Sequence, residues 1–327
     1  MRRTTPGRST SRRLATDTVL RMRALLVVNP KATAASAKLR DVLAHALASE
    51  IKLDVAETAA RGHACELVRQ AAQDGLDVVV ALGGDGTVNE VVNGLLAEGT
   101  GADLPALAVV PAGGTNVFAR ALGMPNSPVE ATSQLLDALR TGRRRTVGLG
   151  RADDRWFTFC AGLGIDAAAV RRMEQHRAKG RRSAPARYVR SAVREFYLGG
   201  AHRQRVITMR RAGAEPVGLG LALVCNTTPW TYLGRRAVRA CPDASFDLGL
   251  DVFGLRGLGT VSTLSQLRQM LLVKGRPRGR QLVAVHDAPA LTLTSSLPLP
   301  LQVDGDDLGD RTHVELRAVP RALSVVL

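Results

Sequence analysis

A cluster of glycines around one carboxylate is the part of the sequence best suited to chemistry. Gly83, Gly84, Asp85 and Gly86 directly follow the apolar run 78–82. Glycines permit backbone angles that other residues avoid, and they remove side chains that would keep a polyphosphate away from main-chain N–H groups. Asp85 would repel phosphate unless a cation or a ribose hydroxyl lies between them. The segment predicts a phosphate-binding turn, with an ordinary strand-to-helix connection as the competing interpretation.

The residues around this turn predict a strand before it and a helix after it. The run 78–82 is apolar throughout, which is typical of a strand buried on both faces. Apolar residues then recur at helical spacing as far as Leu96. We expect Thr87 to cap this helix, with Glu90 three residues later completing a capping box. A helix that begins here directs its positive end at the turn, which favours an anion.

A second glycine segment follows the next predicted strand. Residues 106–116 lead from apolar residues into Gly113, Gly114, Thr115 and Asn116. The Thr hydroxyl and the Asn amide are groups that bind ribose or phosphate. Strands and helices alternate through this half of the chain, which predicts a parallel sheet with ligands at the carboxyl ends of its strands.

The two glycine segments together resemble the nucleotide-binding motifs of the diacylglycerol kinase-like lipid kinases, which include sphingosine kinases and bacterial soluble lipid kinases. Residues 83–95 read GGDGTVNEVVNGL, and residues 111–125 read PAGGTNVFARALGMP. NAD kinases share only the GGDGT core. The resemblance extends over nearly all of the chain after Arg23. It implies an α/β N-terminal domain with an NAD kinase-like parallel sheet, followed by a mainly antiparallel β-sandwich domain.

The resemblance also implies which residues contact the nucleotide. Asn29 and Thr58 match family positions that do so, whereas the residues alone indicate a turn and a helix cap. Asp85 is expected to hold the catalytic Mg²⁺ directly or through water. The expected nucleotide-binding set is Asn29, Thr58, Gly83, Gly84, Gly86, Thr87, Glu90, Gly113, Gly114, Thr115 and Asn116.

A carboxylate near the end of the chain is the expected general base. Residues 304–306 read Asp-Gly-Asp, which by itself predicts a hairpin turn. In the resembling family this segment carries a Glu that is proposed to deprotonate the lipid hydroxyl, and Asp306 stands at its position. Asp is one methylene shorter than Glu, so the backbone must lie closer to the hydroxyl or activity falls.

A structural Mg²⁺ is implied by the resemblance of residues 241–255 to a further family block. With a one-residue deletion, Asp247 takes the place of the family's metal-binding Asp. Many relatives have Asp at the position of Val117 and near Gly148, and in the family Asp usually precedes the glycine that Leu248 precedes here. These three positions therefore depart from the family's metal network. One carboxylate makes a weak Mg²⁺ site unless waters complete it.

The domain organisation follows from length and pattern. The chain of 327 residues exceeds the usual size of one domain, and after residue 146 the pattern changes to short alternating strands. We predict a disordered basic tail over 1–22, a nucleotide-binding α/β domain over 23–146 and a β-rich substrate domain over 147–327. An alternative for the last strand, 322–327, is that it returns to the first domain.

Positive charge is concentrated in three segments. The net charge is +16, and Lys and Arg cluster within 2–23, 171–182 and 274–280. Such patches suit nucleic acid or anionic lipid headgroups, with a solvated surface as the alternative. No nucleic-acid-binding motif accompanies the charge, and aromatic residues make up only 3% of the chain, which counts against specific nucleic-acid binding. A membrane surface is the better prediction.

The compartment is predicted from cysteines and hydropathy. The four cysteines are widely spaced and match no metal-binding pattern. No apolar stretch approaches the roughly 20 residues that span a bilayer, and the N-terminus lacks the apolar core of a signal peptide. We predict a cytoplasmic protein that associates with membranes peripherally. The sequence does not determine the oligomeric state, and a homodimer is one possibility.

The sequence therefore predicts an ATP-dependent lipid kinase that phosphorylates a hydroxyl of diacylglycerol or a related lipid, with ATP and Mg²⁺ as cofactors. Two alternatives stay open. A kinase of a soluble metabolite would use the same first domain, and a catalytically weak nucleotide-binding regulator would bind ATP without turnover.

Overall fold

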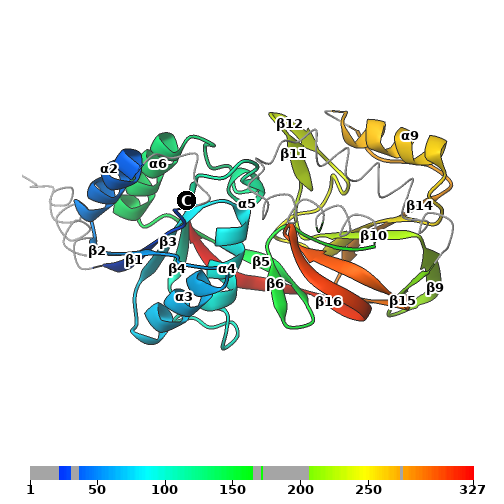
Figure 1. The fold of residues 1–327 in the computed structure, drawn as a ribbon, viewed down its shortest axis with the longest axis horizontal. Coiled ribbons are helices and arrows are strands. Elements are labelled where there is room, and N and C mark those ends of the chain that lie inside the picture. Colours follow the sequence, from blue (N-terminus) through cyan, green and yellow to red (C-terminus); the bar gives the residue numbers. More distant parts are fainter. Residues whose placement is uncertain (1–21, 31–36, 165–170, 172–205, 273–274) are drawn as a thin grey trace, which may run out of the picture. The chain divides into compact units, whose positions relative to one another are not determined.

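The computed structural model describes residues 22–30, 37–164, 171, 206–272 and 275–327. Residues 1–21 of the predicted basic tail lie outside these residues, as does most of the basic segment 171–182. The chain divides into two compact units (Figure 1). Unit 1 contains residues up to Thr146 together with Leu323–Leu327, and unit 2 contains Val147–Ala322.

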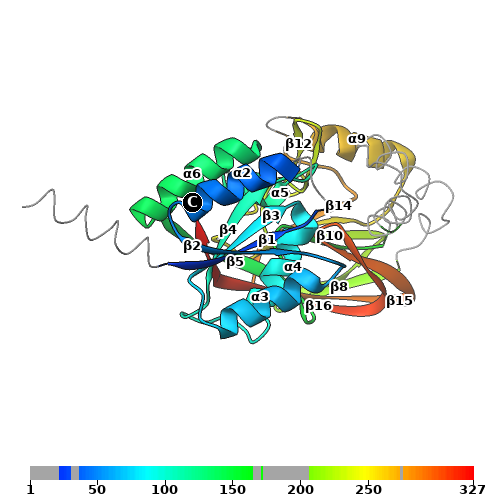
Figure 2. The ribbon, with the colours of Figure 1, turned by 60° about the vertical axis from the view of Figure 1, so that its left-hand side comes forward.

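Unit 1 is a parallel sheet covered by helices on both faces. Its strand order is β16-β4-β3-β1-β2, and every pairing within the unit is parallel. Helices α2 and α6 cover one face while α3 and α4 cover the other (Figure 2). The elements are β1 Arg23–Val28, α2 Ala37–Ala48, β2 Lys52–Glu57, α3 His63–Gln73, β3 Val78–Gly83, α4 Asp85–Leu95, β4 Ala106–Pro111, α5 Val117–Ala121 and α6 Pro128–Thr141.

The central strands of unit 1 are buried because both of their faces meet helices. All six residues of β3 and all six of β4 are buried, as the unbroken apolar runs predict. The end of the last strand, β16, adds to this sheet, where Val325 lies opposite Leu107 of β4. The predicted α/β class with a parallel sheet is confirmed.

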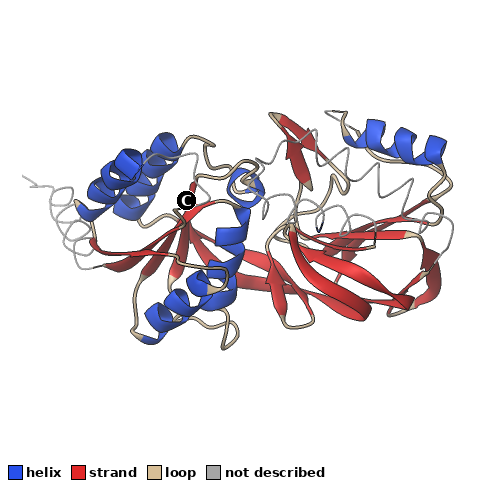
Figure 3. Cartoon of the chain, viewed as in Figure 1, coloured by secondary structure: helices blue, strands red, loops and turns tan. Residues whose placement is uncertain are grey.

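Unit 2 is rich in antiparallel strands (Figure 3). Its main sheet has the order β14-β13-β10-β7-β15-β16. The elements are β5 Arg144–Ala152, β6 Arg155–Phe157, β7 Cys160–Leu163, β8 Ile207–Arg211, β9 Ala214–Leu219, β10 Leu221–Cys225, β11 Thr231–Leu233, β12 Arg236–Val238, β13 Leu250–Leu255, α9 Thr260–Met270, β14 Leu282–Ala288, β15 Ala290–Val303 and β16 Asp306–Val326.

The long strand β15 curls this sheet around one core. Its residues 292–295 pair with β8, whereas its residues 301–303 pair with β7. The register against β16 shifts between these two stretches, and such irregularities bend strands. Leu293 from one stretch and Leu301 from the other lie in the same apolar cluster. The predicted antiparallel domain is confirmed, with its sandwich-like core formed by connected strands of a curled sheet. In the described part of the chain, no helix is long and apolar enough to span a membrane.

Candidate functional site

The two glycine turns of unit 1 touch through their backbones. Strands β3 and β4 end side by side, with Gly83 opposite Pro111, so the turns that follow them are neighbours. A Cβ atom on Gly113 would lie 2.6 Å from the Cα of Gly84, and one on Gly84 would lie 3.2 Å from the Cα of Gly113. Packing therefore requires glycine at Gly113 and makes a side chain at Gly84 tight, before any ligand is considered.

Gly114 has no such packing reason. Nothing in the described chain lies within 4 Å of the position of its missing Cβ, and its φ lies outside the left-handed region. The residue is exposed. A side chain here would meet no other described residue, so packing does not explain the glycine.

Asp85 connects the two turns. It is the first residue of α4, and one of its oxygens accepts a 2.8 Å hydrogen bond from the Thr115 hydroxyl. The other oxygen accepts a 3.3 Å bond from the N–H of Phe118, in the first turn of α5. Mg²⁺ commonly binds one or two carboxylates together with substrate phosphates and waters, and Asp85 fits such a site.

The predicted capping role of Thr87 is wrong. Helix α4 begins at Asp85, and Gly84 is its N-cap without a side-chain hydrogen bond. Thr87 is instead a buried residue of the first helical turn, and its hydroxyl accepts a 3.2 Å bond from the Nδ2 of Asn29. A Cβ on Gly83 would lie 2.6 Å from the Cβ of Thr87, so Gly83 makes room for this threonine.

Glu90 also has a different partner from the predicted one. Its carboxylate accepts a 2.9 Å hydrogen bond from the N–H of Gly62, the left-handed residue that precedes α3. The predicted capping box is therefore absent. Glu90 instead ties the start of α3 to α4.

Asn116 shapes the second turn from within. It adopts a left-handed conformation as the N-cap of α5 and is 3% exposed. Its amide oxygen accepts from the N–H of Gly113, while its NH₂ group donates to the Gly113 carbonyl and to Asn126. Both amide donors are thus engaged inside the protein. We expect Asn116 to position the turn and not to contact a ligand with its amide.

Four neighbouring strands bring most of the predicted nucleotide-binding residues to one edge of the sheet. In the order β4-β3-β1-β2, each strand is followed by one group of them. The second turn follows β4, the first turn follows β3, Asn29 follows β1 and Thr58 follows β2. The hydrogen bond between Asn29 and Thr87 links the group after β1 to the group after β3. The Asp85–Thr115 bond links the group after β3 to the group after β4.

The predicted Asp-Gly hairpin in unit 2 is present, and its first carboxylate has a structural role. Asp304 and Gly305 have φ values of 49° and 84°, as a two-residue type I′ turn requires. Asp304 is 4% exposed. Its carboxylate accepts four hydrogen bonds from the segment 158–160, three of them from backbone N–H groups. The sequence did not reveal this role.

Asp306 is the first residue of β16, opposite Val303, and is half-buried. The carboxylates that follow it are held by Arg171, which makes two hydrogen bonds to Asp307 and one to Asp310. These contacts, first to Asp307 and then to Asp310, raise the pKa of Arg171. Arg171 therefore holds the start of β16, directly after Asp306, at Asp307 and Asp310.

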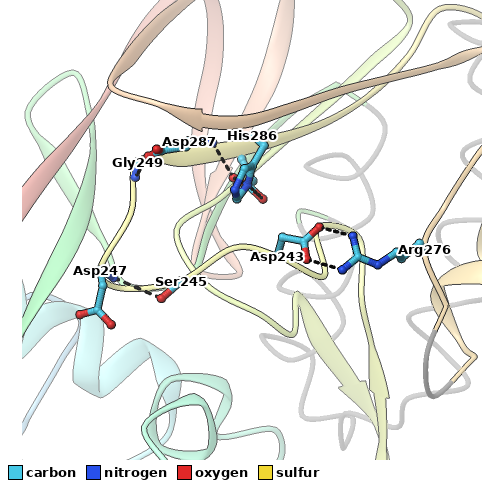
Figure 4. Close-up of polar contacts among 8 residues, drawn as sticks. Asp243, Ser245, Asp247, Gly249, Arg276, His286 and Asp287 are labelled. Carbon is cyan, nitrogen blue, oxygen red and sulfur yellow. Dashed lines mark hydrogen bonds and ion pairs between the residues drawn. The ribbon is translucent and has the colours of Figure 1, made fainter.

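Asp247 is exposed in the loop before β13, and its N–H donates to the hydroxyl of Ser245. Its carboxylate points away from His286 and Arg276 (Figure 4). Among the described residues, no three His, Cys, Asp or Glu side chains gather as a metal site. A Mg²⁺ at Asp247 would need backbone carbonyls and waters for its other ligands.

The buried carboxylate of this region is Asp251. It is 3% exposed and lies 2.8 Å from the Nδ1 of His286, and it also accepts from the N–H of Asp287. Asp251 raises the pKa of His286 through this hydrogen bond and through its charge. The pair stabilises the edge of the sheet between β13 and β14.

Comparison with known proteins gives the same assignment over most of the chain. The diacylglycerol kinase catalytic domain matches residues 23–152. A protein of Stenotrophomonas maltophilia (strain K279a) named "Probable lipid kinase YegS-like" is 32% identical over 310 residues, which cover 90% of this chain and 93% of the relative. The chain belongs to the family of diacylglycerol kinase-like lipid kinases.

Other members of the family extend the comparison. The "Diacylglycerol kinase" of Bacillus subtilis (strain 168) is 38% identical over 107 residues, or 33% of each chain. A crystal structure of a diacylglycerol kinase from Bacillus anthracis str. Sterne has a TM-score of 0.70 at 20% identity, and it covers 93% of this chain and 96% of that one. This second likeness confirms the fold.

Proposed function

We propose that the protein transfers the γ-phosphate of ATP to a hydroxyl of diacylglycerol or of a related lipid. The observation that supports this most is the contact of the two glycine turns beside the open Gly114, in a member of a lipid kinase family. A bare main chain beside the start of α4 suits phosphate, because helix N-termini bind anions.

In this proposal the two turns bind the triphosphate. Gly84 and Gly113 let the turns meet, and Gly114 leaves room for the nucleotide. Asp85 would hold Mg²⁺, which neutralises the phosphate charge when bound. Phosphoryl transfer depends mainly on positioning and charge neutralisation, so the hydrogen bonds from Thr115 and Phe118 to Asp85 matter by fixing that carboxylate.

Asp306 is the proposed general base that accepts the proton of the lipid hydroxyl. The hairpin offers two carboxylates, and Asp304 is excluded from this role because it is buried and holds four hydrogen bonds. Asp306 is half-buried and therefore more exposed to solvent than Asp304. A base has to reach its proton directly or through one water.

Transfer of labelled γ-phosphate to a panel of extracted lipids tests the proposal. We expect the wild type to label a diacylglycerol-like lipid in the presence of Mg²⁺, and Asp85→Ala to lose that labelling by about a hundredfold or more, because a positioned carboxylate is removed. Equal labelling by both proteins would rule out the assignment of Asp85. Labelling of soluble alcohols alone would favour a metabolite kinase, and ATP binding without turnover would indicate a regulator.

Gly114→Val is expected to weaken ATP binding by about tenfold while leaving the thermal unfolding midpoint unchanged, because a side chain here meets ligand and not protein. Isothermal titration with ATP and a thermal melt measure the two effects. Gly101→Val is the matched control, since Gly101 is an exposed loop glycine of unit 1 with little around it.

Gly113→Ala, in contrast to Gly114→Val, should lower the stability of the fold. Its Cβ would meet the Cα of Gly84 at 2.6 Å, so we expect a loss of stability of about 1–3 kcal/mol from overpacking. If Gly114→Val binds ATP as the wild type does, Gly114 does not face the nucleotide.

A further inference from the structure

Helix α9 exposes large apolar side chains. Val261 is 83% exposed and Leu264 is 57% exposed, and Leu272, just beyond the end of the helix, is 47% exposed. Single exposed apolar residues are normal in proteins, but several close together on one element indicate a contact surface.

These residues lie on one side of the helix. Val261, Leu264 and Arg268 follow one another at intervals of three and four, which places them in a row along the helix, and Leu272 follows just beyond its end. Gln266 and Met270, on the opposite side, are buried. The helix therefore packs onto unit 2 by one face and presents an apolar row with one arginine on the other.

The chain around α9 is basic and contains no acid. Residues 252–286 include six Lys and Arg and no Asp or Glu. The segment 275–280 runs beside the helix, because the Arg278 carbonyl accepts from Gln266 at 2.8 Å and the Arg278 N–H donates to Gln269 at 2.9 Å. Arg278 therefore lies next to the side of α9 that carries Gln266 and Gln269 and is not a member of the apolar row. At its start, Arg276 pairs with Asp243 through two hydrogen bonds (Figure 4).

The other arginines of this surface form no ion pair in the part of the chain that the structure describes. These arginines are Arg268, Arg278 and Arg280, and all three are exposed. We call Val261, Leu264, Arg268, Leu272, Arg278 and Arg280 the α9 surface.

We propose that the α9 surface docks onto a bilayer that contains anionic phospholipids. Interfacial helices bind membranes through apolar residues at the headgroup level together with cations on lipid phosphates. Each Lys or Arg near an anionic leaflet contributes about 1 kcal/mol, or roughly fivefold in affinity. The absence of acids along 252–286 favours an anionic partner. The inference deepens the proposed function, since a lipid kinase must reach lipid in a membrane, but its test needs no ATP.

Cosedimentation with vesicles tests the inference. The full-length protein is mixed with vesicles of phosphatidylcholine alone and of phosphatidylcholine with phosphatidylglycerol. We expect the wild type to prefer the anionic vesicles. Val261→Ser/Leu264→Ser should weaken this binding by about tenfold, and Arg268→Gln/Arg278→Gln/Arg280→Gln should abolish the preference for anionic lipid.

Matched controls change the same residue types elsewhere. Val42 and Val55 are 55% and 54% exposed in unit 1, and Arg210 and Arg211 are exposed in β8. Val42→Ser/Val55→Ser and Arg210→Gln/Arg211→Gln should bind vesicles as the wild type does. Thermal melts verify that each variant is folded.

Three results would overturn the inference: no preference of the wild type for anionic vesicles, unchanged binding by both α9 variants, or equal losses in the controls. A concentration-dependent dimer that only the α9 variants lose would assign the surface to a second copy of the chain instead. Lipid phosphorylation in detergent micelles, where no bilayer is needed, separates the two proposals: α9 variants should retain it, whereas failure of the wild type would count against the kinase function alone.

Discussion

Replacement of Asp304 by alanine is expected to lower the free energy of unfolding of unit 2 by about 4 kcal/mol. Its carboxylate accepts from Thr158 N–H, the Thr158 hydroxyl, Phe159 N–H and Cys160 N–H at 2.6–3.0 Å. The residue is 4% exposed, so water cannot easily replace it. Each buried donor left without a partner costs about 1–3 kcal/mol, and three of the four are backbone groups that cannot turn away.

Chemical denaturation followed by circular dichroism measures this loss. Asp304→Asn is the informative companion, because it keeps one acceptor oxygen and should lose less stability than alanine. Asp153 provides a contrast. It has the same φ of 49° as Asp304, so replacement by alanine changes the backbone preference equally at both positions. Its carboxylate, however, accepts a single 2.9 Å bond from an exposed partner, the N–H of Glu315. Asp153→Ala should therefore cost far less. Similar losses for Asp304→Ala and Asp153→Ala would show that the four hydrogen bonds contribute little.

Replacement of Asp306 by asparagine is expected to lower the turnover number by a factor of about 10²–10⁴, the range for loss of a general base. Asparagine has nearly the shape of aspartate but cannot accept the proton. Stability should hold, because Asp306 is only half-buried at the start of β16. ATP binding should also hold, because the proposed nucleotide residues belong to unit 1.

Steady-state phosphorylation of the lipid found active in the panel measures this effect. Asp306→Glu is the matched variant, since it keeps a carboxylate that can accept the proton. Retention of more than half of the wild-type turnover by Asp306→Asn would assign the base elsewhere. The two aspartates of the hairpin thus have different predicted roles. Asp304→Ala should lower stability without a specific catalytic defect, and Asp306→Asn should fold normally and lose turnover.

Local patterns predicted much of unit 1 because its strands and helices are short-range structures. The apolar run 78–82 forms β3, and the helical spacing after it forms α4. The capping pattern at Thr87 and Glu90 failed because α4 begins three residues earlier than the pattern implies, with Gly84 and not Thr87 as its N-cap. At that start, a contact between distant segments, Asp85 with Thr115, decides the geometry.

By itself, the sequence determined the family, the parallel sheet and the order of the motifs, since these depend on residue types at fixed spacing along the chain. Only the tertiary structure decided why Gly113 must be glycine, which of two aspartates in one hairpin is structural, and which side of α9 is exposed. Each of these depends on segments that are far apart in the chain, such as Asp304 and Thr158. Spacing along the chain contains no information on which distant atoms meet, because strand pairing and packing bring them together only in the folded protein.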